Sequence, residues 1–348
     1  MKLLCVLGPF AENKDISCGQ EAKVNNIYKE ITVVFSEDNI YRINTDKSLL
    51  NIILLPFRLF CGLLICRNFL MLPSKKGIKV TTPFVILFNF FLKRKLFYSV
   101  IGGWLKEFLV YNPLLKRMLL KFDGIFVETT TMGKQLKEIG FNNIIIMPNF
   151  KRLSIISDDY CSTTIMKPYK VCTFSRVDRK KGIEDAVKVV NDINREYGND
   201  IYNLDIYGIV EKGQEEWFEK LKMQFNSNIK YLGLIDSEKT TEVLKNYFCL
   251  LFPTHYYTEG LPGTIIDAFS SGIPVVSSKW ESFEDVIDDG VNGFGYEIND
   301  ISEMKSILKR LAENPDVVLK MKSQCIKKAR KYLPEEAIKI LTREFAYE

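Results

Sequence analysis

The chain has 348 residues, of which 47% are hydrophobic and 26% are charged. This composition is typical of a globular protein, and it excludes disorder, collagen and coiled coil as descriptions of the whole chain. The length is sufficient for about two domains, each with its own core.

The net charge of +5 is mild, whereas a protein that binds nucleic acid is usually more basic, so we predict no nucleic-acid partner. The charge is unevenly distributed, since residues 1–150 hold 20 basic and 11 acidic side chains and residues 151–348 hold 28 and 32. Residues 47–106 contain ten basic residues and no acidic one, between long apolar runs. Such a segment suits an anionic membrane surface or an anionic lipid-linked ligand. It also suits a plain core whose helix ends carry basic residues, and the sequence leaves both interpretations open.

The eight cysteines include no C-x-x-C pair and no zinc-ligand spacing. Cys5, Cys172 and Cys249 lie in apolar, strand-like runs, which predicts buried free thiols in a reducing compartment. Because His255 is the single histidine, a site with several histidine ligands is excluded. We therefore predict no metal site.

The first residues, MKLLCVLGPFAE, contain an apolar run too short for a convincing signal peptide. No stretch reaches the roughly 18–20 apolar residues that a membrane-spanning helix needs. We therefore expect a cytoplasmic protein, either free or resting on the inner face of the cell membrane.

Short apolar runs alternate with longer helical patterns from the beginning of the chain. Such alternation predicts parallel sheets covered by helices on both faces. In the first half we expect strands at 2–8, 31–35, 96–100, 124–128 and 143–147, and helical segments at 47–67 and 131–139.

The alternation stops over residues 151–169, where no clear period is present, and then restarts. The second half predicts strands at 170–174, 204–209, 229–232, 249–252 and 274–277, and helices at 182–197, 214–224, 237–247, 263–271, 301–312 and 317–332. The predicted fold class is α/β, with two Rossmann-like domains that face a central cleft. We place the first domain at 1–165, the second at 166–332 and a final helix at 333–348, which is expected to cross back to the first domain.

The stretch FSRVDRKKG, residues 174–182, follows a predicted strand and opens a helix. It contains Arg176, Arg179, Lys180 and Lys181. Arginine offers a planar fork of donors and lysine a mobile point charge, a combination that suits a diphosphate. A solvated basic turn is the plainer interpretation of the same residues.

The stretch EGLPGTIID, residues 259–267, follows the apolar run CLLFPT. Its glycines allow a ligand to approach the backbone, and its helix start would present N–H groups to an anion. Glu259 would lie in the loop before that helix, and Asp267 within it. A helix cap with ordinary surface acids is the plainer alternative.

These two segments, at this separation, resemble the retaining glycosyltransferases of family 4, also called group 1, which have the GT-B fold. FSRVDRKKG resembles that family's G-R-L-x-x-x-K-G stretch, and EGLPGTIIDAFSSGIPVVSS resembles its E-x7-E segment with the following A-x-x-x-G-x-P-V-V run. The turn DDGVNGFGYEIND is similar to the next family motif. In the first half only VIGGWLKEFL, FVET and MPNF are similar to members that assemble bacterial polysaccharides.

The resemblance implies a role for each matching position. Arg176 and Lys181 would hold the donor diphosphate and neutralise the leaving nucleotide, and Glu259 would contact the donor sugar. Asp267 would bond the ribose hydroxyls. The implied donor-binding positions also include Gly19, Gln20, Gly260, Leu261, Pro262, Gly263, Thr264 and, near the base, Leu234.

The sequence departs from the family at several positions. Asp267 replaces the usual Glu, which shortens its reach by ~1.5 Å, and Ser175 replaces the usual Gly. The first half holds no histidine. His255 could line the cleft, as could Gly102 and Gly103, although a structural role fits the lone histidine equally well.

The resemblance implies a hexosyltransferase-type glycosyltransferase. It would move a sugar from a nucleotide-diphosphate sugar, with UDP or GDP favoured, to a saccharide or a polyprenyl-diphosphate-linked saccharide. It implies retention of configuration, no obligatory metal or other cofactor, and a place in the synthesis of capsule, lipopolysaccharide or a similar cell-surface polysaccharide. The alternatives are a catalytically silent partner subunit that binds a nucleotide sugar, and an epimerase of the same fold.

Overall fold

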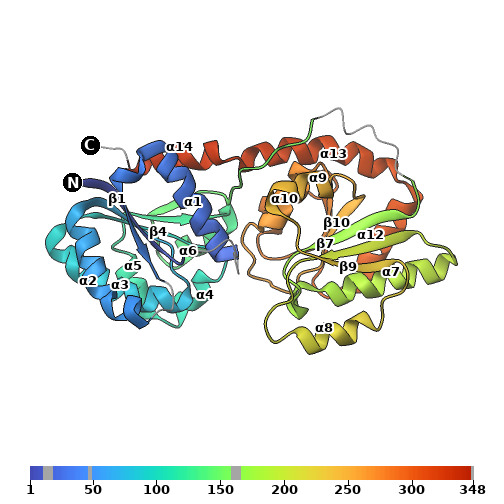
Figure 1. The fold of residues 1–348 in the computed structure, drawn as a ribbon, viewed down its shortest axis with the longest axis horizontal. Coiled ribbons are helices and arrows are strands. Elements are labelled where there is room, and N and C mark those ends of the chain that lie inside the picture. Colours follow the sequence, from blue (N-terminus) through green and yellow to red (C-terminus); the bar gives the residue numbers. More distant parts are fainter. Residues whose placement is uncertain (11–18, 46–48, 158–165, 346–348) are drawn as a thin grey trace. The chain divides into compact units, whose positions relative to one another are not determined.

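The computed structural model describes residues 1–10, 19–45, 49–157 and 166–345, which form two compact units (Figure 1). Unit 1 comprises Met1–Lys151 with Pro334–Glu348, and unit 2 comprises Arg152–Leu333. The division after Lys151 lies earlier in the chain than the predicted boundary after residue 165. Its physical reason is that Leu153 and Ile155 already pack against the core of unit 2, and the backbone N–H of Ile156 donates to the carbonyl of Ser270 at 3.1 Å.

Unit 1 has a six-stranded parallel sheet in the order β2-β1-β3-β4-β5-β6. Its strands are β1 (Lys2–Gly8), β2 (Ile40–Asn44), β3 (Cys66–Met71), β4 (Lys95–Ser99), β5 (Gly124–Val127) and β6 (Ile144–Ile146). Its helices are α1 (Gly19–Phe35), α2 (Leu49–Ile65), α3 (Lys75–Leu92), α4 (Leu105–Val110), α5 (Pro113–Leu119), α6 (Thr130–Glu138) and α14 (Pro334–Phe345).

Both faces of this sheet are buried. Leu4 and Val6 of β1 join the core with α1 and α14, whereas Cys5 and Leu7 join the core with α2 to α6. Successive side chains of a strand point to opposite faces, so an apolar run with no polar alternation is needed here. The C-terminal helix α14 packs in unit 1, where the amide of Asn68 donates to the carbonyl of Phe345 at 3.2 Å.

Unit 2 has a second six-stranded parallel sheet in the order β12-β11-β10-β7-β8-β9. Its strands are β7 (Tyr169–Phe174), β8 (Tyr202–Tyr207), β9 (Ile229–Gly233), β10 (Cys249–Phe252), β11 (Val275–Ser278) and β12 (Gly293–Tyr296). Its helices are α7 (Ile183–Tyr197), α8 (Glu215–Lys222), α9 (Thr240–Leu244), α10 (Gly263–Ser270), α11 (Phe283–Val286), α12 (Ile301–Glu313) and α13 (Asp316–Ala329). Helices α7, α8 and α12 share a core on one face of the sheet, and α9, α10 and α13 on the other.

The predicted fold class, α/β with two Rossmann-like domains, is confirmed by these two parallel sheets. Cys5, Cys172 and Cys249 are buried and free, as predicted. Among the described residues, no helix is both long enough and apolar enough to cross a membrane.

Several element predictions in the first half are wrong. Residues 31–35 are the last turns of α1 and not a strand, because Val24, Ile27 and Ile31 form one buried helical stripe. The strands β2, β3 and β12 and the helix α3 were not predicted. Helix α3 is almost as apolar as a buried strand, and its composition therefore hides its period.

The strand orders place one reversal in each sheet. In unit 2 the chain runs outward from β7 to β8 and β9, and then returns to place β10 on the other side of β7. In unit 1 the corresponding reversal lies between β1 and β3. Ligands of open parallel sheets bind at such a reversal, beyond the carboxyl ends of the strands. A ligand-binding site in unit 2 is therefore expected at the loops that follow β7 and β10.

Candidate functional site

The loops after β7 and β10 meet at Gly182. This glycine has φ +68°, and a Cβ atom placed on it would lie 1.8 Å from the carbonyl oxygen of Pro253. The backbone N–H of His255 donates to the carbonyl of Lys180 at 2.8 Å, which adds a second link between the loops. Only glycine allows two backbones to approach this closely in this conformation.

Lys181 and Glu259 form an ion pair across these loops, although 78 residues separate them in the chain. Their side chains are only 12% and 18% exposed. The hydroxyl of Thr254 donates to the same carboxylate oxygen, Oε1 of Glu259, at 3.3 Å. The ammonium of Lys181 also lies 5.0 Å from the ring centre of Tyr256. The pair is therefore partly desolvated, and its charge interaction is stronger than it would be in water.

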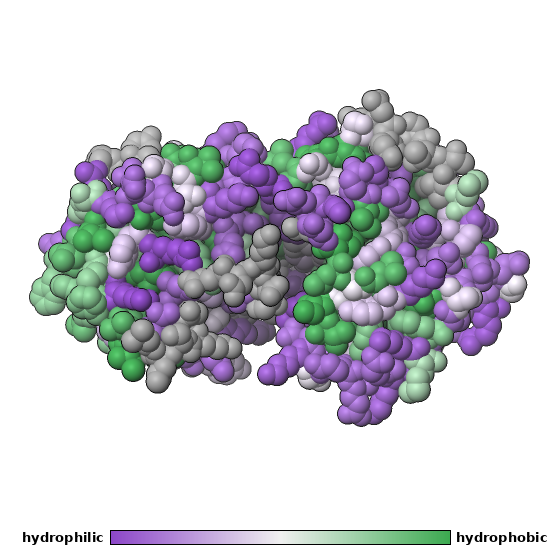
Figure 2. Space-filling model, viewed as in Figure 1, coloured by the Kyte–Doolittle hydropathy of each residue, from purple (hydrophilic) through white to green (hydrophobic). Residues whose placement is uncertain are grey.

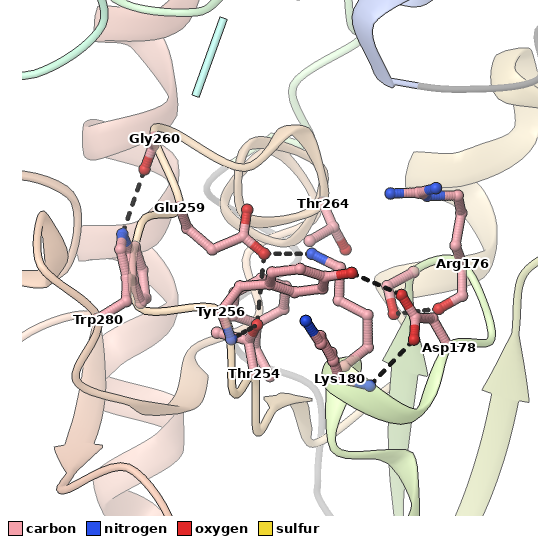
Figure 3. A network of polar contacts seen from close by, with 12 residues as sticks. Arg176, Asp178, Lys180, Thr254, Tyr256, Glu259, Gly260, Thr264 and Trp280 are labelled. Atoms are coloured by element: carbon pink, nitrogen blue, oxygen red, sulfur yellow. Dashed lines mark hydrogen bonds and ion pairs between the residues drawn. The ribbon is translucent and has the colours of Figure 1, made fainter. Parts of the chain in front are cut away.

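Asp178 and Tyr256 form a second link between the two loops, shown in Figure 3. The phenol of Tyr256 donates to Oδ2 of Asp178 at 2.7 Å, and Oδ1 accepts from the backbone N–H of Lys180 at 3.0 Å. Burial, followed by the hydrogen bond to Asp178, raises the pKa of Tyr256 to about 12. The phenol therefore stays protonated and keeps its donor role at every physiological pH.

Arg176 lies on the same loop but pairs with a third segment. Its guanidinium contacts Glu211, in the loop after β8, and the two side chains are 38% and 36% exposed. Figure 3 shows its side chain reaching the side of the network where Thr264 lies. A guanidinium has five N–H donors, so contact with one carboxylate oxygen leaves donors for an anion.

The start of α10 completes this edge of the sheet. Gly263 and Thr264 form its first turn, whose N–H groups have no partner within the helix. The hydroxyl of Thr264 donates to the carbonyl of Phe174, which fixes the helix start to the end of β7. The indole N–H of Trp280 donates to the carbonyl of Gly260 at 3.2 Å and holds the preceding loop (Figure 3). Leu261 is buried beside Pro262 in that loop.

Three predicted residues lie outside this network. His255 is exposed, and its Nε2 lies 2.6 Å from Oδ2 of Asp185 on α7. Leu234 follows β9 and is also exposed. Asp267 lies one turn into α10 with 2% of its surface exposed.

Unit 1 has a pocket of its own, with a volume of about 360 Å³, at the reversal between β1 and β3. It is lined by residues that follow β1, β3 and β4, namely Gln20, Pro73, Ser74, Lys75, Lys76, Ile101 and Trp104. The ammonium of Lys75 lies 5.2 Å from the ring centre of Trp104. An aromatic face with two ammonium groups and no acid in the lining suits a saccharide that carries negative charge.

The predicted positions in unit 1 lie around this pocket. Gly19 and Gln20 begin α1, and the amide of Gln20 donates to the carbonyl of Leu72 at 3.2 Å. Gly102 and Gly103 lie in the turn between β4 and α4, directly between Ile101 and Trp104, which line the pocket. Residues 11–18, directly before Gly19, lie outside the described residues.

Among residues 1–10, 19–45, 49–157 and 166–345, no group of three or more His, Cys, Asp or Glu side chains could hold a metal ion. At the carboxyl edge of unit 2, Glu259 is instead paired with Lys181, and Glu211 with Arg176.

Sequence reasoning missed five members of the network: Asp178, Glu211, Thr254, Tyr256 and Trp280. The capping role of Asp178 could have been predicted, because aspartate is a preferred residue at the start of a helical turn. The other four give no local signal. Their roles depend on contacts between segments that are far apart in the chain.

The two parallel sheets, each with a site at its reversal, are those of the GT-B glycosyltransferases, which have two Rossmann-like domains. Residues 162–332 match the family model described as glycosyl transferases group 1. This match spans nearly all of unit 2, and the C-terminal unit is therefore similar to the group 1 glycosyltransferases.

Individual relatives agree with this similarity. An uncharacterised glycosyltransferase of Methanocaldococcus jannaschii is 26% identical over 165 residues, which are 46% of this chain and 40% of the relative. The amylovoran biosynthesis glycosyltransferase AmsK of Erwinia amylovora is 24% identical over 157 residues, 44% of this chain and 38% of the relative. The chain thus spans about two fifths of the length of these two relatives.

The fold of the whole chain is similar to that of HepE from Anabaena, whose crystal structure contains UDP. The TM-score is 0.76 at 14% identity, and the alignment covers 99% of this chain and 98% of HepE. The likeness shows a shared fold for both units, including the half outside the family match.

We predict that Gly182→Ala destabilises unit 2 far more than the control Gly198→Ala. Both glycines have a positive φ, but a Cβ on Gly198 meets nothing within 4 Å, whereas one on Gly182 meets the carbonyl of Pro253. The free energy of unfolding should fall by about 1 kcal/mol in the control and by about 3 kcal/mol or more in Gly182→Ala.

Urea unfolding followed by tryptophan fluorescence measures this difference, because Trp217 and Trp280 place two of the three tryptophans in unit 2. Equal losses in the two variants would show that the loops after β7 and β10 are not held by this backbone contact.

Proposed function

We propose that this protein transfers a sugar from a nucleotide-diphosphate sugar, with UDP as the nucleotide, to a saccharide or lipid-linked saccharide. The observation that carries the proposal is the pairing of Lys181 with Glu259 beside Arg176 and the start of α10. These groups meet at the reversal of a sheet whose unit is similar to the group 1 glycosyltransferases. They combine two cations, a helix start and a carboxylate, which are the groups a diphosphate and a sugar hydroxyl require.

Lys181 can serve the diphosphate without leaving Glu259. An ammonium has three N–H donors, and its contact with the carboxylate uses one of them. A phosphate oxygen would take another, and Arg176 would add further donors from the neighbouring position. As the bond between the sugar and the diphosphate breaks, negative charge gathers on the departing phosphate, and these fixed cations stabilise it.

Glu259 is proposed to contact the donor sugar. Its Oε1 accepts from both Lys181 and Thr254, which fixes the carboxylate and leaves Oε2 for a sugar hydroxyl. Backbone N–H groups of residues 260–264 would bind the sugar and the phosphates, and Asp267 the ribose. We propose retention of configuration and a hexosyl donor on the resemblance to family 4.

The choice of UDP is supported by HepE, which has been crystallised with UDP and with UDP-glucose. The relative named for amylovoran biosynthesis supports a place in the assembly of a cell-surface polysaccharide. The pocket of Gln20, Lys75, Lys76 and Trp104 is proposed to hold an anionic part of the acceptor.

We predict that UDP raises the melting temperature of the protein more than GDP, CDP, ADP or dTDP does. A ligand at 100 times its dissociation constant adds about 2.7 kcal/mol to the free energy of unfolding. The variants Arg176→Ala and Lys181→Met should lose this shift and most transfer activity. The control Lys188→Met, which removes an exposed ammonium on α7 that is paired with Asp192 of the same helix, should keep both.

Each result of this thermal-shift series has a definite meaning. A shift with GDP alone would replace the proposed nucleotide, and no shift with any nucleotide would contradict the donor site. UDP binding without transfer to any saccharide would favour the catalytically silent partner subunit, and turnover without an acceptor would favour an epimerase.

The acceptor pocket has a separate prediction. Trp104→Ala should raise the KM for the saccharide acceptor at least tenfold and leave the UDP-induced shift unchanged, because the indole forms part of the pocket wall in unit 1. Acceptor kinetics measured at saturating donor give this value. An unchanged KM would place the acceptor elsewhere.

A further inference from the structure

Helix α2 carries an apolar stripe that no described part of the chain covers. Ile53, Phe57, Phe60 and Leu64 follow one another at helical spacing and are all exposed, Phe57 to 66%. The opposite side of the helix is buried, with Leu59 and Leu63 in the core of unit 1. Helix α2 therefore has one apolar face that packs in the core of unit 1 and a second apolar face that is exposed.

Helix α3 repeats this arrangement. Val80 and Leu87 are exposed on one side of the helix, and Phe90 and Phe91 at its end are each 76% exposed. Ile78 and Val85 face the core. Exposed phenylalanines at this level are costly in water, since each leaves a large apolar ring hydrated.

The two stripes form one surface. The rings of Phe60 on α2 and Phe88 on α3 are in edge-to-face contact, with their centres 5.4 Å apart, and Phe84 stacks on Phe88. Figure 2 shows hydrophobic side chains gathered at the end of unit 1 where Figure 1 places α2 and α3. We call this surface the α2–α3 face. It comprises the exposed side chains of Ile52, Ile53, Leu54, Phe57, Phe60, Leu64, Val80, Leu87, Phe90 and Phe91.

Exposed lysines, here called the basic rim, lie at both ends of α3 beside the α2–α3 face. No acidic residue occurs between residues 47 and 106, a segment that includes both helices and the strands next to them. Lys76 and Lys79 lie near the start of α3, and Lys93 and Lys95 follow its end, all of them exposed. An apolar surface with a basic rim has the chemistry of a lipid-binding surface. The acyl chains of the lipids would pack against the aromatic rings, and the anionic headgroups would pair with the ammonium groups.

We propose that the α2–α3 face docks unit 1 on an anionic lipid bilayer, with the apolar side chains among the lipids and the basic rim at the headgroups. This docking goes beyond sugar transfer and does not depend on it. It would bring a lipid-linked acceptor to the enzyme if the proposed function holds.

A bilayer fits this face better than a second copy of the chain does. Two copies joined through their α2–α3 faces would bring two basic rims together without an acid from residues 47–106 to offset them. An anionic bilayer supplies the missing negative charge over the whole area at once. Charge complementarity therefore selects the lipid surface.

The experiment is flotation of the full chain with vesicles of phosphatidylcholine, with and without phosphatidylglycerol. The protein should float with the anionic vesicles, and salt should weaken the binding. Partitioning should fall at least tenfold in the double variant Phe90→Ser/Phe91→Ser. It should also fall tenfold or more in Lys93→Glu/Lys95→Glu, because each basic residue near an anionic surface contributes about fivefold.

Met223→Asp is the matched control, since it changes an equally exposed apolar residue in unit 2 and should leave flotation unchanged. The variants replace exposed side chains, and their melting temperatures should equal that of the wild type. Failure of the wild type to float, or undiminished flotation of the phenylalanine variant, would overturn the proposal. So would a dimer that dissociates in Phe90→Ser/Phe91→Ser, because it would show that a second copy covers the face.

The change in melting temperature with UDP distinguishes a failure of the bilayer proposal from a failure of the proposed function. Binding to vesicles with no response to any nucleotide would leave the bilayer proposal standing and remove the proposed function. A UDP response without vesicle binding would do the reverse.

Discussion

The contact between the loops after β7 and β10 is the constraint on which the candidate site depends. Gly182 lets the two backbones touch at Pro253, and this contact brings Lys181 within reach of Glu259. Both charges of the pair are partly desolvated, with side chains only 12% and 18% exposed, so each stabilises the other. In the proposed function, a bound diphosphate and sugar would replace part of this mutual neutralisation.

The second half of the chain was largely predictable from its sequence. Its strands are short apolar runs bounded by polar turns, and β7, β10 and α10 lie within a residue or two of their predicted bounds. The two motifs also identified the loops that meet. The sequence could not show that Arg176 pairs with Glu211, or that Tyr256 supports Asp178, because these partners come from different loops and have no fixed spacing.

Unit 1 was harder to predict for a definite physical reason. Helix α3, which was missed, is apolar on the side that faces the core and also on the side that faces outward, so the usual contrast between faces is missing. The same property that hid α3 from sequence analysis is the one that suggests a lipid surface. The basic, acid-free composition of residues 47–106 was visible in the sequence, but only the fold shows that its apolar side chains are not all used in the core.

We propose that the carboxyl edge of unit 2 binds a diphosphate through Lys181, Arg176 and the start of α10. Calorimetric titration with UDP, and in parallel with uridine, tests it most directly, because the two ligands differ only in the diphosphate. Two or more charge-assisted hydrogen bonds, each contributing about 1.5–3 kcal/mol, predict that UDP binds at least about 100-fold more tightly than uridine. Equal affinities would contradict the account, since the nucleoside and not the phosphates would then supply the binding energy.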